Sequence, residues 1–137
     1  MVISLARNEE KNEIKKYDSH IESNKLEECI HNQFVYVLKV ENKIIGVLRY
    51  SYFWQSIPFL DLINIDLNYQ KKGYGSKMMI YWENLMLTKG YKDVMLSTQE
   101  DETSKYFYEK LGYKYIGKFL PPNQDVYELM YTKKLKM

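Results

Sequence analysis

The stretch that decides the fold is Gln70-Lys71-Lys72-Gly73-Tyr74-Gly75-Ser76. It follows a strand-like apolar run, residues 59–67, and opens a helix-like run, residues 77–89. A glycine-bearing turn between a strand and a helix leaves several main-chain N–H groups unpaired, and the positive end of the helix dipole adds to their attraction for an anion. Gly73 and Gly75 let the main chain approach a phosphate without an intervening Cβ. The stretch therefore predicts a site for a phosphate-bearing ligand.

Two other phosphate loops do not fit this stretch. A Walker A loop has four residues between its glycines and ends in Gly-Lys-Ser/Thr, whereas here one residue separates Gly73 from Gly75, and Ser76 precedes Lys77. A dinucleotide-binding loop has a third glycine, and Met78 stands in its place. The remaining pattern, Gln-x-x-Gly-x-Gly, also occurs in ordinary strand-to-helix turns, so a second signal is needed.

That signal lies in residues 104–113, a short helix-like run ended by a glycine. Its sequence, Phe107-Tyr108-Glu109-Lys110-Leu111-Gly112-Tyr113, resembles the Phe-Tyr-x-Lys-x-Gly-Phe/Tyr segment of the GNAT superfamily of N-acetyltransferases. The earlier stretch resembles that superfamily's Arg/Gln-x-x-Gly-x-Gly/Ala signature, in the family's order. The resemblance covers essentially the whole chain. It implies one N-acetyltransferase domain over residues 1–137, of α/β (mixed α+β) class, with a mixed central sheet of six or seven strands and helices on both faces.

Hydrophobic periodicity predicts the elements between these motifs. Strands are expected at residues 2–6, 34–40, 44–53, 59–67, 92–98, 113–119 and 126–132. Helices are expected after a cap at Asn8, after a cap at Ser23, over residues 77–89, and after a cap at Asp101 or Thr103. The strand at 92–98 should run parallel to the strand at 59–67, which reads as a central strand buried on both faces.

Composition limits the other classes of function. The 137 residues carry 20 basic and 18 acidic side chains, a net charge of +2 that is too balanced to indicate a nucleic-acid binder. Only Lys133, Lys134 and Lys136 favour nucleic-acid binding, and we expect none. Apolar runs are too short to span a membrane, and no signal peptide is evident, so a cytoplasmic protein with no membrane partner is expected.

Cysteine and histidine usage indicates no metal or disulfide. Cys29 is the only cysteine, so no intrachain disulfide can form, and a buried packing role is expected for it. His20 and His31 lie eleven residues apart without partners at metal-ligand spacing. The sequence thus predicts no metal cofactor.

The resemblance implies acetyl-coenzyme A as the acetyl donor. The main-chain amides of residues 70–76 would bind its pyrophosphate, and the main chain at Ile63 and Ile65 would pair with the pantetheine arm. Gln70 stands where many family members have arginine, so one fixed charge is missing. Lys71, Lys72 and Lys77 offer positive charge nearby, although each also fits as an ordinary surface lysine.

Two residues are candidates for proton transfer. Tyr108 occupies the position of the family's tyrosine acid, which would donate to the departing thiolate; the alternative is a packed core tyrosine. Asp61 lies nine residues before Gln70, where some family members carry an acidic residue, and would receive the amine's proton. A solvated aspartate is the alternative, and a chain of waters would then act as the base. Asp66 is expected to be structural.

The acceptor is expected to be a primary amine of a small molecule or a peptide. Its contacts would include the aromatic residues Tyr52, Phe53 and Trp54, which suit a cationic amine. Core packing or a homodimer interface would explain the same residues. Asp101 and Ser104 replace an asparagine and an alanine common in the family. The asparagine often binds the pantetheine arm, and an ionised aspartate can accept a hydrogen bond there but cannot donate one. A catalytically silent acyl-coenzyme A sensor is the main alternative function.

Overall fold

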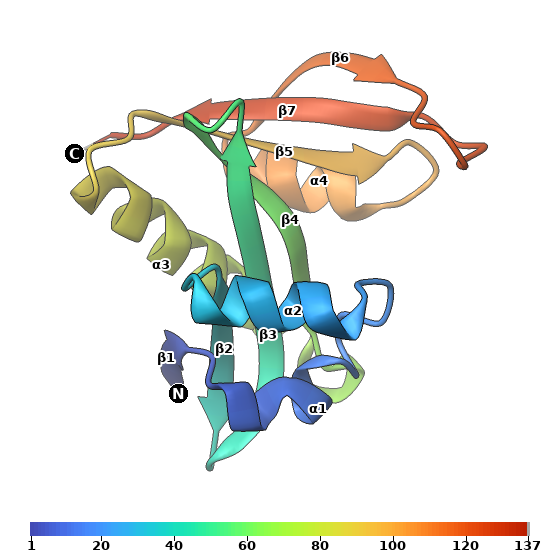
Figure 1. Ribbon diagram of the computed structural model, residues 1–137. Helices are drawn as coiled ribbons and strands as arrows, with labels where there is room; N and C mark the ends of the chain where they lie inside the picture. The colour runs from blue at the N-terminus through green and yellow to red at the C-terminus, as the bar shows by residue number, and fades with distance from the viewer. Residues whose placement is uncertain (137) are drawn as a thin grey trace. The chain divides into compact units, whose positions relative to one another are not determined.

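The order of elements along the chain agrees with the prediction. The computed structural model describes residues 1–136, so residue 137, the last of the predicted domain, lies outside it. Figure 1 shows the elements, which are β1 (Val2–Leu5), a 3₁₀ turn (Asn8–Glu10), α1 (Lys11–Ile14), α2 (Ser23–His31), β2 (Val35–Val40), β3 (Lys43–Phe53), β4 (Ile57–Ile65), a second 3₁₀ turn (Leu67–Tyr69), α3 (Tyr74–Thr88), β5 (Asp93–Gln99), α4 (Ser104–Lys110), β6 (Lys114–Phe119) and β7 (Glu128–Lys134).

The strands form one mixed sheet in the order β1-β2-β3-β4-β5-β7-β6. β4 and β5 are parallel, as expected for two strands joined through α3, whereas β1–β2, β2–β3, β5–β7 and β6–β7 are antiparallel. The chain divides into two compact units. Unit 1 comprises Met1–Ser51 and Asp61–Trp82, and unit 2 comprises Tyr52–Leu60 together with the residues from Glu83 onward.

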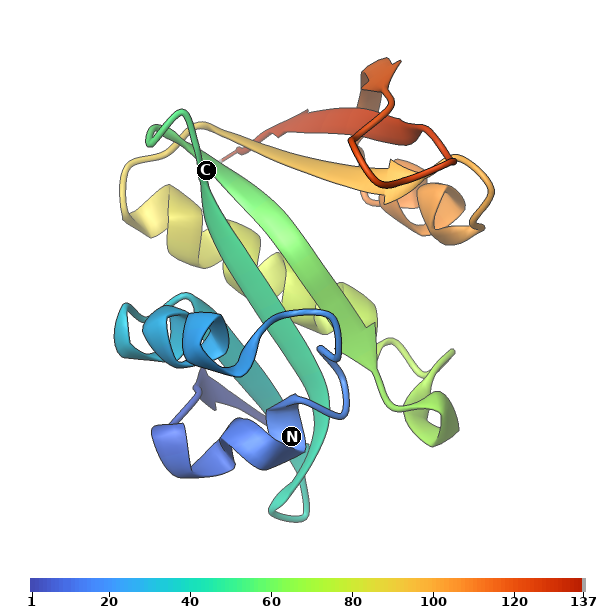
Figure 2. The same cartoon turned by 45° about the vertical axis from the view of Figure 1, so that its right-hand side comes forward.

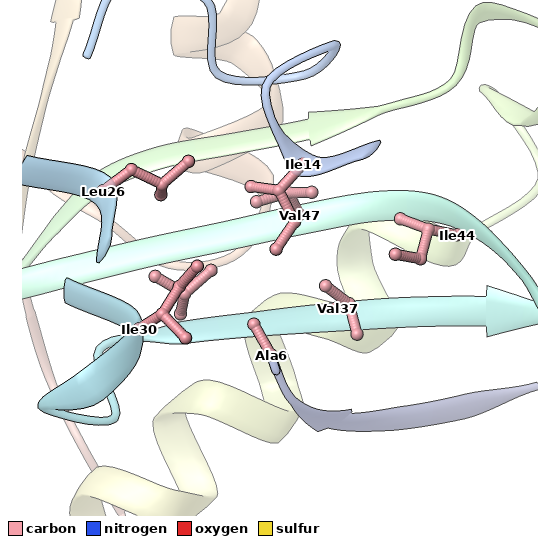
Figure 3. Packing of buried hydrophobic residues seen from close by; sticks show 8 residues of the cluster. Ala6, Ile14, Leu26, Ile30, Val37, Ile44 and Val47 are labelled. Atoms are coloured by element: carbon pink, nitrogen blue, oxygen red, sulfur yellow. The ribbon is translucent and has the colours of Figure 1, made fainter. Parts of the chain in front are cut away.

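One face of the unit 1 sheet is covered by α1 and α2. A cluster of buried aliphatic side chains fills this layer (Figure 3), and its members are Ala6, Ile14, Leu26, Ile30, Val35, Val37, Ile44 and Val47. Cys29, predicted to be buried, is only half-buried and packs against the edge of this cluster. Burial raises the pKa of its thiol, which suits a packing role rather than a reactive one.

The opposite face of the unit 1 sheet packs against the first part of α3. Because side chains alternate along a strand, Tyr36 points away from the aliphatic cluster, and its ring centroid lies 5.7 Å from that of Tyr81. Gly46 permits this close packing: a Cβ at that position would lie 2.7 Å from Ile65 Cδ1 and 3.5 Å from Met78 Sδ. Unit 1 therefore has helices on both faces of its sheet, as predicted.

Unit 2 is built around β5, with β7 and then the edge strand β6 beside it (Figure 2). Within this unit α4 packs against β5. Glu83 is buried and accepts hydrogen bonds from Tyr113 OH and Lys133 Nζ, both at 2.8 Å. The phenol of Tyr131 in turn donates to Glu109 at 2.8 Å, which ties β7 to α4.

Several element boundaries differ from the prediction. β4 begins at Ile57, two residues before the expected start, and so contains Pro58. The turn that precedes it includes Trp54 and Gln55, whose φ angles are +53° and +57°. β4 is also not buried on both faces throughout, since Asp61 and Asn64 are exposed. The last strand, β7, starts two residues later than expected.

Helix starts were the least accurate part of the prediction. The N-cap position of α2 is Glu22, in extended conformation, so Ser23 is the first helical residue rather than the cap. α1 is only four residues long and follows a 3₁₀ turn whose N-cap is Arg7 rather than Asn8. α3 begins at Tyr74, three residues before the expected start, because its first turn carries no apolar periodicity to reveal it.

Candidate functional site

The turn after β4 is built by local hydrogen bonds. The Asp66 carboxylate accepts the N–H of Asn68 at 2.9 Å and so starts the 3₁₀ turn at Leu67–Tyr69. Gln70 then folds back, and its Nε2 donates to the carbonyl oxygen of Ile65 at 2.8 Å. The side chain of Gln70 is therefore engaged with the end of β4, which fixes the course of the loop.

The loop enters α3 through a left-handed glycine. Gly73 has a φ of +86°, and a Cβ at this position would meet no atom within 4 Å. The first amide of the helix to bond back is that of Lys77, which donates to the Gly73 carbonyl at 3.1 Å. The N–H groups of Tyr74, Gly75 and Ser76 precede it, and the first amides of an α-helix have no intrahelical acceptor. Open space beside a helix N-terminus of this kind suits an anion.

Three lysines surround this loop. Lys71, Lys72 and Lys77 are all exposed, and Lys71 has a φ of +63°. The ammonium of Lys72 lies 5.7 Å from the ring centroid of Tyr69, and that of Lys77 lies 5.6 Å from the ring centroid of Tyr74. The aromatic faces thus hold two cations near the loop, where they add positive potential without being buried.

β4 supplies the predicted main-chain positions. It pairs with β5 at Phe59↔Met95 and Leu60↔Leu96. Ile63 is half-buried and Ile65 is buried, and both lie on the strand whose main chain was predicted to bind pantetheine. The Ile65 carbonyl already accepts the bond from Gln70, although a carbonyl oxygen has a second lone pair.

Asp61 directly follows the last β4–β5 pair. Its side chain is 24% exposed while the residue as a whole is exposed, so the accessible part is mainly main chain. Burial raises the pKa of the Asp61 carboxyl above its usual range, and the charge of Asp18 adds to that rise. A hydrogen bond from Ser51 and the charge of Arg49 offset part of it. A carboxylate whose pKa is raised in this way is a better proton acceptor than a solvated one.

Sequence reasoning missed two charged neighbours of Asp61. Arg49, on β3, donates from Nε to Asp18 Oδ2 at 2.7 Å, and its Nη1 lies 3.7 Å from Asp61 Oδ2. Asp18, in the connection between α1 and α2, has a side chain only 3% exposed. An arginine within an otherwise apolar strand was the signal that could have found this cluster, because a buried charge needs a partner.

The other polar residues near the end of β4 hold the same connection. Asn64 Nδ2 donates to the Tyr17 carbonyl oxygen at 3.1 Å. The Tyr17 hydroxyl donates to Asp66 at 3.0 Å, beside the Ile44 carbonyl at 3.1 Å. Asp66 therefore binds both Tyr17 and the 3₁₀ turn, in agreement with the structural role expected for it.

Tyr108 lies on α4 in unit 2 and is 8% exposed. Its ring contacts those of Phe107 and Tyr113, with centroid distances of 5.3 Å and 6.0 Å. Burial, and then the charge of Glu102, raises the pKa of Tyr108 to about 12. The phenol therefore keeps its proton at neutral pH and can act as a hydrogen-bond donor. Gly112, with a φ of +95°, ends the helix as predicted.

The predicted acceptor residues lie at the tip of the β3–β4 hairpin, in unit 2. Tyr52 packs on Tyr91 with a centroid distance of 5.3 Å, and Phe53 stacks on Phe59 at 6.2 Å. Trp54 contacts Phe53 at 4.8 Å and is 81% exposed. The tip is thus an aromatic cluster with one large face open to solvent.

Among residues 1–136, no helix is both long and apolar enough to cross a membrane. Within the same residues, no three histidine, cysteine, aspartate or glutamate side chains gather as ligands of a metal ion would.

Solved structures of N-acetyltransferases share this fold. A ribosomal-protein-S18-alanine N-acetyltransferase from Escherichia coli superposes with a TM-score of 0.80 at 14% identity, covering 99% of this chain and 94% of that one. Ard1 from Thermoplasma volcanium gives 0.88 at 14% identity, covering 99% and 98%. An aminoglycoside 6′-N-acetyltransferase complexed with coenzyme A gives 0.84 at 17% identity, covering 100% and 98%. Identities this low establish the fold and nothing finer.

The family assignment comes from the sequence model. No curated protein matches the chain. The model described as the Acetyltransferase (GNAT) family matches residues 4–113, well over half of the chain, and it spans both signature segments. The chain belongs to the GNAT family of acetyltransferases.

Proposed function

We propose that the chain is an N-acetyltransferase that moves acetyl from acetyl-coenzyme A to a primary amine, by direct attack of the amine in a ternary complex. The observation that carries the proposal is the glycine turn at the start of α3. There Gly73 leaves open space next to helix amides without intrahelical acceptors, within the family's signature. The coenzyme A complex of a structurally similar aminoglycoside acetyltransferase supports the choice of donor.

Residues 70–76 fit the pyrophosphate of acetyl-coenzyme A. The main-chain amides at Gly75 and Ser76 would donate to phosphate oxygens, and the helix dipole and the exposed lysines would add positive potential. Gln70 would act indirectly, because its side chain holds the loop against Ile65. When bound, the donor supplies an activated thioester; Ile63 and Ile65 would hold its arm through their main chain.

Tyr108 would stabilise the leaving sulfur. With a pKa raised to about 12, the phenol is a weaker acid than an ordinary tyrosine. Full proton transfer to a thiolate, whose pKa is near that of a cysteine thiol at about 8.5, is uphill. The residue would therefore lower the barrier mainly by donating a hydrogen bond to the sulfur as negative charge develops there.

Asp61 would prepare the acceptor amine. An amine attacks only in its neutral form, so the ammonium that arrives must lose a proton. A carboxylate with a raised pKa can hold the ammonium by its charge and then accept the proton. Tyr52, Phe53 and Trp54 would contribute aromatic faces that attract a cationic acceptor.

The direct test is a panel of small amines, amino acids and peptides, scored by release of free thiol from acetyl-coenzyme A. The proposal expects turnover with at least one cationic amine and tight coenzyme A binding by calorimetry. Binding of coenzyme A without turnover on any member of a broad panel would favour a catalytically silent acyl-coenzyme A sensor instead.

The phosphate loop has its own test. Gly75 lies in the first turn of α3, so Gly75→Val adds bulk beside the expected pyrophosphate without placing a side chain on a left-handed residue. Coenzyme A affinity should fall at least tenfold, about 1.4 kcal/mol. Asn84→Val, on the same helix and exposed, is the matched control and should leave the affinity unchanged. Equal affinities for the two variants would reject the loop assignment.

A further inference from the structure

The polar residues of β4 contact, directly or through Arg49, the connection between α1 and α2. Asn64 holds the carbonyl of Tyr17, the residue before Asp18. Asp61 is linked to Asp18 itself, through Arg49. Polar residues at two positions of an otherwise apolar strand need partners or a function, and here both reach the same connection.

Of the three charged groups, Arg49 lies between the two carboxylates and contacts them unequally. It donates hydrogen bonds to Asp18 from two nitrogens, from Nε to Oδ2 at 2.7 Å and from Nη2 to Oδ1 at 3.4 Å. Its remaining nitrogen, Nη1, is an ion-pair distance of 3.7 Å from Asp61 Oδ2, beyond a good hydrogen bond. Asp61 therefore receives attraction from Arg49, but the two hydrogen bonds of the guanidinium go to Asp18.

The local charge does not balance. Two carboxylates, Asp18 and Asp61, face one guanidinium, so the cluster carries one net negative charge when both are ionised. Ser51 donates to Asp61 and adds no charge. From α2, Cys29 also faces the cluster, but burial raises the pKa of its thiol and keeps it neutral. A partly buried negative charge without a full partner attracts a cation.

We propose that Arg49 and Asp18 are positioning residues for Asp61: Asp18 fixes Arg49, Arg49 holds the Asp61 carboxylate on β4, and the net negative charge of the three selects the ammonium form of the acceptor. The proposal rests on the proposed function, since it assigns Asp61 to the acceptor side of that reaction. It names the class of acceptor, a primary amine that arrives as a cation.

Substitutions of the two positioning residues should shift the pKa of Asp61 in opposite directions. Arg49→Met removes a positive charge, so the pKa of Asp61 should rise. Asp18→Asn removes a negative charge with little change in the shape of the side chain. It also frees Arg49 to pair with Asp61, so the pKa of Asp61 should fall. It also makes the cluster neutral, and KM for a cationic amine should rise roughly fivefold, the effect of one charge through partly solvated protein.

The experiment follows the Asp61 carboxyl carbon by NMR across the pH range, with its signal assigned from the spectrum of Asp61→Asn. The same variants are assayed for kcat/KM against pH with the best amine of the panel. Opposite shifts of the Asp61 titration, with the acidic limb of the rate profile moving in the same directions, would support the proposal. Shifts in one direction, or none, with only a loss of stability, would overturn it and leave Asp18 and Arg49 as anchors of the connection.

Two further variants keep the test decisive. If Arg49→Met does not fold, Arg49→Lys is used instead, because it retains the positive charge but loses the planar guanidinium. It should leave the acidic limb of the rate profile close to its wild-type position while binding the Asp61 carboxylate more weakly. Ser51→Ala removes a neutral donor and should raise the pKa of Asp61 without changing the net charge or KM. If the NMR shifts appear but no amine is acetylated, the electrostatic positioning stands and the proposed reaction fails. The two failures are therefore distinguishable.

Discussion

Each unit of the molecule buries a carboxylate against a cation, and the two pairings leave different charges behind. In unit 2, Glu83 accepts one bond from Lys133 and one from Tyr113, each at 2.8 Å. The Lys133 ammonium also lies 5.5 Å from the ring centroid of Tyr113. One negative group is thus paired with one positive group, and the pair carries no net charge.

In unit 1, one guanidinium serves two carboxylates. Asp18 accepts hydrogen bonds from Arg49 at 2.7 Å and 3.4 Å, and Asp61 is left with a contact of 3.7 Å and a raised pKa. A balanced buried pair leaves no net charge, whereas an unbalanced one has charge available for a ligand. The same reasoning makes Asp61, rather than Glu83, the candidate for chemistry.

Tyr108→Phe would break the comparison most strongly, since it tests whether unit 2 supplies chemistry as well as support. The variant keeps the ring and its contacts with Phe107 and Tyr113 and removes only the hydroxyl. Turnover should fall roughly 10²–10³-fold while coenzyme A affinity barely changes, because the hydrogen bond to the sulfur strengthens as charge develops in the transition state. Steady-state assays with the best amine, together with calorimetry, measure both. Full activity would reduce Tyr108 to a packing residue.

Asp61→Asn should have the next largest effect. It removes the charge with little change of shape, so the rate at neutral pH should drop about 10²-fold and the acidic limb of the pH–rate profile should flatten. Coenzyme A binding should be nearly unchanged. A parental pH profile would mean that water or another group deprotonates the amine, and a collapse of coenzyme A binding would mean that Asp61 has a structural role.

The balanced pair predicts a loss of stability without a loss of rate. Glu83→Gln leaves Lys133 without its counter-charge, but that side chain is 23% exposed, so solvent relieves part of the penalty. The free energy of unfolding in urea should fall by about 1–3 kcal/mol, below the cost of breaking a fully buried pair. Turnover should stay within about twofold of wild type. A tenfold loss of turnover in a folded variant would remove the distinction between the two clusters.

Sequence predicted the parts of the molecule that are locally encoded. The order of strands and helices and the glycine turn at Gly73 follow from periodicity and from backbone freedom, which short windows reveal. The Asp18–Arg49 pair was missed because its members are 31 positions apart and meet only once the connection after α1 is folded onto β3. Asp61 could be named as a candidate, since a charge in an apolar run is visible in sequence, but its partners could not.

The smallest effect is also the most specific, and it concerns the sign of pH-dependent stability. Burial raises the pKa of Asp61 in the folded state, so the folded protein binds that proton more tightly than the unfolded chain does. The stability from this group is greatest below its unfolded pKa, about 3.9, and is lost as pH rises through the folded value. The amide side chain in Asp61→Asn cannot ionise, so the variant does not lose this stability as pH rises. At pH 7 it should be more stable than wild type, and the difference should vanish near pH 3.

Glu10 in the same unit should show the opposite sign. Burial alone would raise its pKa, but hydrogen bonds from Lys39 and from the Arg7 amide hold the pKa below the usual range. Its stabilisation is therefore present above the unfolded pKa and lost as pH falls through the folded one. Glu10→Gln should destabilise the protein at pH 7 and converge with wild type in acid. Urea unfolding of both variants at pH 3, 5 and 7 measures the signs. If Asp61→Asn is less stable than wild type at pH 7, Arg49 fully compensates the charge of the Asp61 carboxylate. The cluster in unit 1 would then have no more charge available for a ligand than the cluster around Glu83.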